Sequence, residues 1–152
     1  MKLLNGRELV GLVKHEIKQC ACDDVARELA ENPEAIVIDI RETEEVTLGM
    51  IAGAVHIPRG VLEMEITDHK SVKHSDNPLQ TLASKSIYLY CRSGARSALA
   101  AKSLNAMGLS QVWSMAGGFN LWVEQKRSVV SKQQAKLWEV DGLYAWEQGG
   151  GI

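Results

Sequence analysis

The sequence predicts an α/β fold in which a central, mostly parallel five-stranded sheet is covered by helices on both faces. Short apolar runs of strand length alternate along the chain with segments whose apolar residues recur at helical spacing. This alternation is typical of parallel strands joined by crossover helices, which gives three layers. A chain of 152 residues is long enough for one domain with a substantial core and too short for two.

Five segments have the short, apolar character of buried strands. The clearest is Ile87-Tyr88-Leu89-Tyr90, which is β-branched and aromatic, and Ile36 to Ile40 is a second apolar run. The predicted strands are residues 17–20, 36–40, 54–57, 87–90 and 112–114.

Helical spacing of apolar residues marks most of the connections. A first helix in residues 5–16 carries Leu9 and Val13 on one face, and we expect it to pack across the edge of the sheet. A second helix is expected to begin at an Asp23 cap and to end before Pro33. Further helices are predicted at 42–48, at 61–66, from Arg96 or Ser97 to Gly108, and through Phe119, Trp122 and Val123.

Residues 67–86 interrupt this alternation with a run of polar side chains. We interpret the segment as a long mobile connection and a candidate substrate lid. Its histidines, His69 and His74, invite a metal site, but no third ligand is nearby in the sequence. We therefore expect both histidines to be solvated.

A seven-residue run, Cys91-Arg92-Ser93-Gly94-Ala95-Arg96-Ser97, lies between the fourth predicted strand and the helix after it. A cysteine at that junction lies at the carboxyl edge of the sheet, where α/β folds bind ligands. The small residues let the loop amides turn inward as an anion-binding nest, which the positive end of the helix reinforces. Because both features favour a thiolate, Cys91 is the candidate nucleophile.

Three chemistries use a cysteine in such a cradle: sulfur transfer, phosphate-ester hydrolysis and arsenate reduction. Cysteine phosphatases carry a histidine before the cysteine and five residues between the cysteine and an arginine that grips phosphate. Here Tyr90 precedes the cysteine and only four residues separate Cys91 from Arg96. The shorter ring suits one extra sulfur atom better than a tetrahedral phosphate, which favours a Cys91 persulfide.

The two arginines of the loop have two interpretations each. Arg92 and Arg96 would attract an anionic sulfur donor such as thiosulfate. Alternatively, Arg96 bonds loop carbonyls and Arg92 points into solvent.

The strand, the Cys91–Ser97 loop and its helix resemble the active-site segment of single-domain rhodaneses, which are thiosulfate sulfurtransferases. Two further segments agree with that family: IVIDIRETEEVTLGMIAGAVHIP from Ile36 to Pro58, and AGGFNLW from Ala116 to Trp122. The resemblance covers about residues 16–128 in the right order. One departure is Met50, where the family commonly has histidine, and we expect that position to be structural.

The resemblance implies a rhodanese-like fold and transfer of sulfane sulfur from thiosulfate or a persulfide to a thiol or cyanide. Neither a metal nor a cofactor is expected, because the persulfide itself carries the sulfur. Cys91 would be catalytic, and the substrate-binding loop would comprise Arg92, Ser93, Gly94, Ala95, Arg96 and Ser97.

Three charged residues are expected to support the loop. Asp39 and Arg41 match the family's Asp-x-Arg and would order the loop beneath the cysteine as an ion pair, or form a surface pair of little consequence. Arg59 would add to a positive rim that attracts anionic donors, or be an ordinary solvated residue.

Two other functions stay open at this stage. One is a sulfur- or anion-sensing binding module with little turnover, which presents its ligand to a partner. The other is a cysteine phosphatase or arsenate reductase, which the loop length and Tyr90 disfavour.

The composition limits partners and location. The 17 basic and 19 acidic residues nearly balance and form no basic run, so no nucleic-acid partner is expected. No apolar stretch approaches the ~20 residues of a membrane span. Arg7, Glu8 and Lys14 interrupt any signal-like segment, which makes a cytoplasmic location the expectation. Cys20 and Cys22 are interpreted as structural, because no local cation would activate them.

We divide the chain into an N-terminal helical extension (1–15), a rhodanese-like domain (16–128) and a C-terminal extension (129–152). Trp138 and Trp146 of the last segment need burial. The domain surface would supply it, or else a second subunit or a protein partner.

Overall fold

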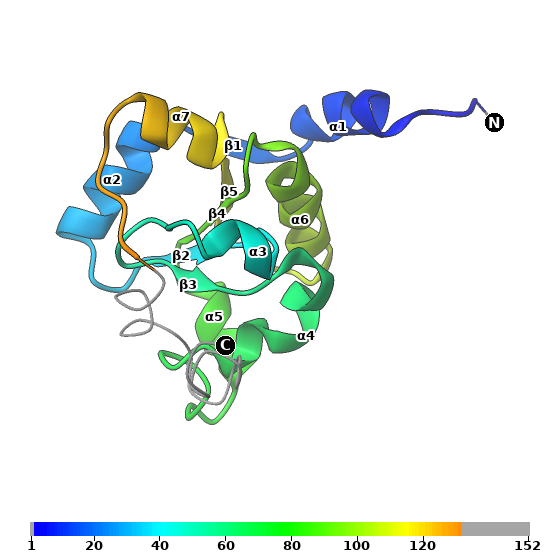
Figure 1. Cartoon of the computed structure of the whole chain (residues 1–152). Coiled ribbons are helices and arrows are strands. Elements are labelled where there is room, and N and C mark those ends of the chain that lie inside the picture. Colours follow the sequence, from blue (N-terminus) through cyan, green and yellow to red (C-terminus); the bar gives the residue numbers. More distant parts are fainter. Residues whose placement is uncertain (1, 132–152) are drawn as a thin grey trace.

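The computed structural model describes residues 2–131, and its five strands form one sheet in the order β1-β5-β4-β2-β3 (Figure 1). Every neighbouring pair of strands is parallel, which confirms the predicted fold class. The strands are β1 (Lys18–Cys20), β2 (Ile36–Asp39), β3 (Val55–His56), β4 (Ile87–Tyr90) and β5 (Val112–Met115).

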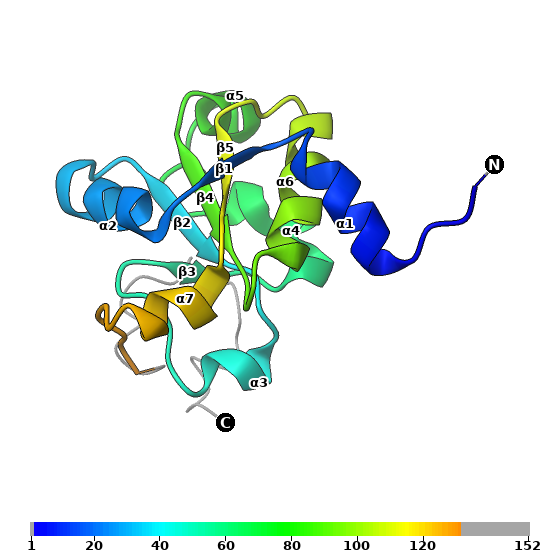
Figure 2. The same ribbon diagram turned by 90° about the horizontal axis from the view of Figure 1, so that it is seen from above.

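Helices cover both faces of the sheet, and Figure 2 shows α2 and α7 on one side with α6 and α4 on the other. The first face carries α2 (Cys22–Glu31) and α7 (Gly118–Glu124). The second face carries α4 (Leu62–Glu65), α5 (Pro78–Ala83) and α6 (Ala95–Ala106), with 3₁₀ turns at Arg59–Val61 and Ile66–Asp68. The remaining helices are α1 (Gly6–Lys14) and the single turn α3 (Thr43–Val46).

The central strands are buried on both faces, which is why they read as continuous apolar runs. Ile36, Ile38 and Leu89 pack into the cluster under α4, α5 and α6. Val37 and Tyr88 point the other way, into the cluster under α2 and α7. Alternation of this kind leaves the carboxyl edge of the sheet as the place where polar groups gather.

Two N-terminal helices differ from their predictions. α1 packs against α6 rather than across the sheet edge, and only Val13 of the helix is buried while Leu9 is exposed. α2 begins at Cys22, and Asp23 is not its cap. Instead the carboxylate of Asp24 accepts the Ala21 N–H at 2.8 Å, so a side chain inside the first turn closes the helix end.

The prediction of a mobile lid at residues 67–86 is wrong. The segment holds α5, whose N-cap Asn77 accepts the Gln80 N–H at 3.1 Å, and Val72 and Leu82 are buried in the core. It leads into the amino end of β4, whereas Cys91 follows the carboxyl end of that strand. Val72 and Leu82 are surrounded by polar residues in the sequence, so no apolar periodicity indicates that they are buried.

The C-terminal extension is described only at its start. Val130 pairs with Met50 through two backbone hydrogen bonds, of 3.0 and 2.9 Å, which form an antiparallel bridge. The side chain of Met50 is also buried. Met50 therefore packs in the core and pairs through its backbone, as a structural residue does. Trp138 and Trp146 lie outside the described residues.

His69 contradicts the expectation of a solvated histidine, because it is only 8% exposed. Its Nδ1 accepts the Ser71 N–H at 3.1 Å and lies 2.8 Å from the Ser71 hydroxyl. Burial, followed by the charges of Lys70 and Lys85, lowers the pKa of His69 to about 4. The folded protein therefore favours neutral His69.

Acidification should weaken the fold through His69. The unfolded chain takes up a proton near pH 6.5 and the folded chain only near pH 4, so stability falls as the pH drops between these values. We expect a loss of about 2–3 kcal/mol across this window. His69→Asn, which keeps an acceptor but does not titrate, should lack this loss in urea unfolding measured from pH 7 to 4. Parallel pH profiles for both proteins would contradict the prediction.

Candidate active site

Cys91 directly follows β4, at the carboxyl end of the central strand. Its Sγ accepts the Gly94 N–H at 3.1 Å and the Ser97 N–H at 3.4 Å, and the residue is 1% exposed. Gly94 has a φ of +104°, a conformation that favours glycine and turns the loop back over the sulfur. The loop thus wraps the sulfur with backbone donors.

Further donors of the loop remain available. The amides of Ser93, Ala95 and Arg96 find no acceptor among the described residues. Ala95 and Arg96 begin α6, a 12-residue helix whose first N–H groups carry the positive end of its dipole. An anion held beside Sγ would therefore meet both oriented amides and a favourable field.

The second glycine of Gly117-Gly118 explains how α7 reaches the loop. The Phe119 N–H donates to the carbonyl of Cys91 at 2.8 Å, and the Asn120 N–H donates to that of Arg92 at 3.0 Å. A Cβ on Gly118 would lie 2.5 Å from the Cys91 carbonyl oxygen. Only a residue without a side chain permits this approach, which fixes the backbone of Cys91.

Arg96 is engaged by a carboxylate that the sequence did not indicate. Its two terminal nitrogens donate to the two carboxylate oxygens of Glu45, in α3, at 2.8 and 2.9 Å. The hydrogen bonds from Arg96 lower the pKa of Glu45 to about 2, and Glu45 raises the pKa of Arg96. Arg96 therefore ties the loop to α3 through a carboxylate rather than through loop carbonyls.

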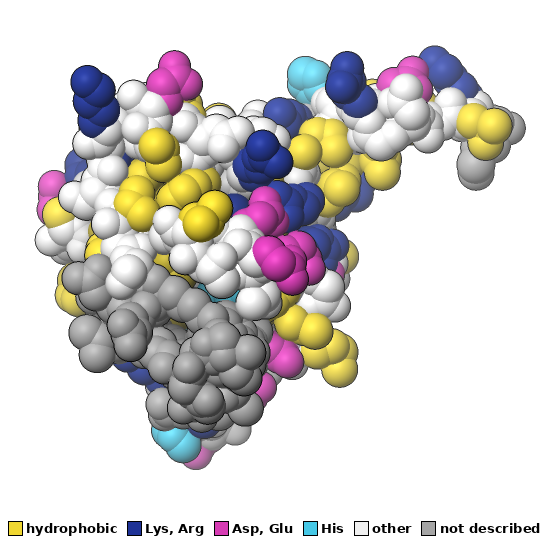
Figure 3. Space-filling model, in the orientation of Figure 1, with side chains coloured by type: hydrophobic (Ala, Val, Ile, Leu, Met, Phe, Trp, Pro, Cys, Tyr) yellow, Lys and Arg dark blue, Asp and Glu magenta, His cyan; other side chains and the backbone are white. Residues whose placement is uncertain are grey.

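Arg92 is the arginine whose charge is available. It is exposed and makes no ion pair with any described residue. It lines a hollow of about 400 Å³ that also has Glu44, Leu48 and Phe119 in its wall. Figure 3 shows hydrophobic side chains gathered on this face between α7 and α3, flanked by basic and acidic ones.

Asp39 and Arg41 form a buried ion pair beside the site. Arg41 Nη2 lies 2.8 Å from Asp39 Oδ2 and donates to the carbonyl of Gly49 at 2.7 Å. The guanidinium carbon is 3.9 Å from the ring centre of Phe119. The pair thus connects the end of β2 to the segment after α3 and to α7.

Arg59 lies further round the same edge and is half-buried. Its Nη1 lies 2.8 Å from Glu63 Oε2, one turn along the chain. The charge of Arg59 is compensated locally, so it contributes little to a positive rim.

Ser114, a polar residue that sequence inspection missed, lies near Cys91 and is connected to it through Ser97. Ser97 Oγ is 3.5 Å from Cys91 Sγ and 2.7 Å from Ser114 Oγ, and both serines are fully buried. No local motif singles out Ser114, because it reaches the site from β5 only through the sheet.

The other two cysteines lie away from this chemistry. Burial raises the pKa of Cys20 to about 12, and burial also raises the pKa of Cys22. Both belong to the cluster under α2 and α7. Within the described part of the chain, no group of three or more His, Cys, Asp or Glu residues could hold a metal ion. None of the helices in residues 2–131 is long and apolar enough to cross a membrane.

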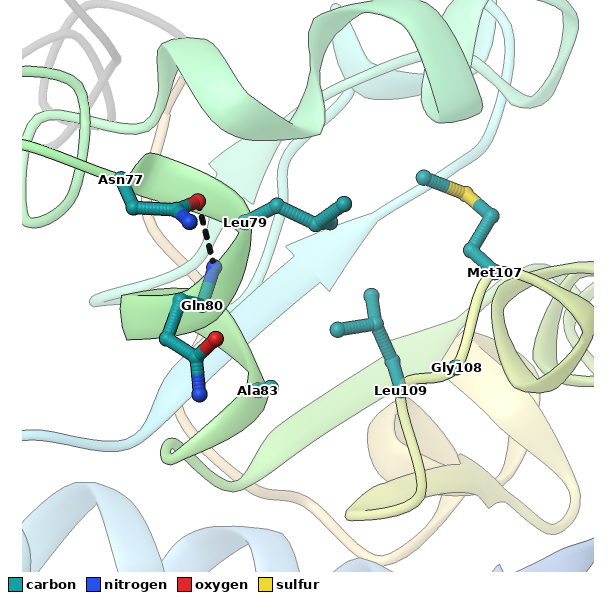
Figure 4. A pocket seen from close by; sticks show the side chains of 7 residues that line it. All are labelled: Asn77, Leu79, Gln80, Ala83, Met107, Gly108 and Leu109. Carbon is teal, nitrogen blue, oxygen red and sulfur yellow. Dashed lines mark hydrogen bonds between the residues drawn. The ribbon is translucent and has the colours of Figure 1, made fainter.

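A different hollow, of about 170 Å³, lies between α5 and the end of α6. Figure 4 shows Leu79, Met107 and Leu109 pointing toward it, while Asn77 caps the first turn of α5. Its wall has no ionisable side chain and borders the segments that enter β4 and β5. It offers no reactive group and is not the candidate site.

Gly118→Ala should disturb Cys91 from the neighbouring helix. The added Cβ would collide with the Cys91 carbonyl, and we expect a loss of about 2–4 kcal/mol in stability. Slower alkylation of Cys91 by iodoacetamide should accompany it, because the loop must move. Gly11→Ala is the matched control: nothing lies within 4 Å of its Cβ position in α1. Wild-type stability in Gly118→Ala would show that the close approach is unimportant.

Comparisons with known proteins identify the family of this chain. The sequence model of the rhodanese-like domain matches residues 22–125. A sulfurtransferase of Allochromatium vinosum is 25% identical over 117 residues, which cover 77% of this chain and 98% of that protein. The thiosulfate sulfurtransferase GlpE of Ectopseudomonas mendocina is 35% identical over 97 residues, 64% of this chain and 77% of GlpE.

A solved structure from Rhodopseudomonas palustris, described as a protein of unknown function and possible tyrosine phosphatase, superposes with a TM-score of 0.68. It is 26% identical, and the match covers 86% of this chain and 97% of that one. The family match spans well over half of the chain and includes both the loop and α7. The chain therefore belongs to the rhodanese-like domain family.

Proposed function

We propose that this protein transfers sulfane sulfur from an anionic donor to a thiol or cyanide acceptor through a persulfide on Cys91. The observation that carries the proposal is the cradle around Sγ, in which the Gly94 and Ser97 amides donate at 3.1 and 3.4 Å. Sulfurtransferases among its relatives support the same chemistry.

In the first half-reaction, the Cys91 thiolate attacks the outer sulfur of thiosulfate. The sulfur–sulfur bond of the donor breaks, and sulfite leaves with its electron pair. Cys91 then carries one additional sulfur, whose negative charge the free loop amides and the N-terminus of α6 would stabilise.

In the second half-reaction, an acceptor thiolate or cyanide attacks the terminal sulfur of the persulfide. The bond between the two sulfurs breaks, and its electrons return to Cys91 as a thiolate. Proton transfer by a strong base is unnecessary if the thiolate is already stabilised. Both steps use the same donors, so one cradle serves the complete cycle.

The position of Arg96 favours sulfur over phosphate as the transferred group. A cysteine phosphatase needs an arginine free to bind phosphate bidentately. Here both terminal nitrogens of Arg96 already donate to Glu45. The short loop therefore has its arginine committed to structure, and Arg92 is left to meet the donor.

A persulfide predicts a specific change in mass. Incubation with thiosulfate, followed by intact-protein mass spectrometry, should show a gain of one sulfur atom that cyanide removes. Cys91→Ser should show no gain, whereas Cys20→Ser and Cys22→Ser should behave as wild type, because those thiols lie outside the cradle. An unchanged wild-type mass, or an unchanged gain in Cys91→Ser, would refute the proposal. A gain without steady-state turnover would instead identify a sensing module.

Substitutions of the two loop arginines should affect different kinetic constants. Arg92→Gln should raise KM for thiosulfate about tenfold with little change in kcat, as expected for one lost charge-assisted hydrogen bond. Added salt should weaken donor capture by wild type and not by this variant. Arg96→Gln should instead lower kcat and stability, because it leaves Glu45 unpaired. Equal effects of the two substitutions on KM would argue against this division of roles.

A further inference from the structure

Among the described residues of the sheet, Ser114 is the one buried polar side chain on the face toward α6. On β5 it shares its face with Val112, and Leu89 is its neighbour on β4. Ile36, Ile38, Ile87, Leu89 and Val112 all belong to the apolar cluster on that side. A fully buried hydroxyl is costly in such surroundings unless it is hydrogen-bonded, so its partner is informative.

The partner of Ser114 is the residue that touches the nucleophile. Ser114 Oγ lies 2.7 Å from Ser97 Oγ. Ser97 Oγ in turn lies 3.5 Å from Cys91 Sγ, and the Ser97 N–H donates to the same sulfur at 3.4 Å. A chain of two hydroxyls therefore runs from the sheet to the sulfur.

Proton counting shows what Ser114 can control. The Ser97 hydroxyl has one proton and two neighbours, the sulfur of Cys91 and the oxygen of Ser114. If Ser97 donates to Ser114, its proton is unavailable to the sulfur. If Ser114 donates to Ser97, the Ser97 proton points to the sulfur, which is the arrangement that stabilises a thiolate.

We propose that Ser114 is a positioning residue: its hydroxyl donates to Ser97 Oγ and so directs the Ser97 proton toward the Cys91 thiolate. The proposal rests on the proposed use of Cys91 as a nucleophile. When Cys91 is protonated, the direction reverses, and the thiol donates to Ser97. The two hydroxyl groups thus reverse their direction of donation when the sulfur changes its charge, and no heavy atom moves.

The same arrangement bears on both half-reactions. In the first, it increases the fraction of Cys91 present as thiolate. In the second, Cys91 is the leaving group, and the Ser97 proton meets the charge that develops on Sγ as the sulfur–sulfur bond breaks. No proton is transferred along the chain in either step, because Ser114 and Ser97 only orient their hydroxyl groups.

The test measures thiolate reactivity without requiring sulfur transfer. The rate of Cys91 alkylation by iodoacetamide is followed from pH 5 to 10 by peptide mass, which separates Cys91 from Cys20 and Cys22. Ser114→Ala removes the donor that polarises the Ser97 hydroxyl toward the sulfur, so it should move the midpoint of this profile to higher pH and slow alkylation at pH 7 about two- to threefold. A profile that superposes on that of wild type would overturn the proposal.

Two controls separate positioning from packing. Ser114→Thr keeps a hydroxyl, and Ser114→Val has nearly the same shape as the threonine variant but no hydroxyl. The midpoint of the alkylation profile should therefore move in the valine variant only. Ser97→Ala should shift the profile as well, and adding Ser114→Ala to it should have no further effect. Equal profiles for threonine and valine, or additive shifts in the double variant, would assign Ser114 a structural role alone.

Discussion

The buried ion pair between Asp39 and Arg41 is the interaction on which the edge of the sheet around Cys91 depends. Asp39 ends β2 and is fully buried, and its carboxylate holds Arg41 through Nε and Nη2 at 3.0 and 2.8 Å. Arg41 then donates to the backbone carbonyl of Gly49, eight residues further along the chain. Because an unpaired buried charge costs about 3–5 kcal/mol, this connection strongly fixes the segment beyond the sheet.

The Asp39–Arg41 pair is connected to the Cys91 loop from two sides. The segment it fixes includes α3, from which Glu45 holds Arg96 at the start of α6. On the other side, the guanidinium of Arg41 lies against Phe119, whose N–H holds the carbonyl of Cys91. The loop is thus clamped from α3 and from α7, while its remaining amides stay available to an anion. A rigid donor set of this kind needs no reorganisation when charge develops on sulfur.

Much of the fold was predictable because buried strands and helix faces require apolar residues at regular spacings in the sequence. The run IVID of β2 and the run IYLY of β4 are buried on both faces, so they read as apolar whatever lies around them. The segment 67–86 was misread because its anchors, Val72 and Leu82, are isolated among polar residues. Asp23 and Asp24 offer similar caps, and only the observed turn geometry distinguishes the residue that closes α2.

The sequence by itself determined the order of strands and helices, the length of the Cys91–Ser97 loop and its place after a central strand. These properties depend on residues close together in the chain, whose periodicity reflects backbone geometry. Only the tertiary structure decided which groups meet at the sulfur: Glu45 pairs with Arg96 across 51 positions, and Ser114 reaches Ser97 across 17. The sheet topology brings these partners together, because it places distant strand ends at one edge. No pattern of neighbouring residues in the sequence indicates such a contact.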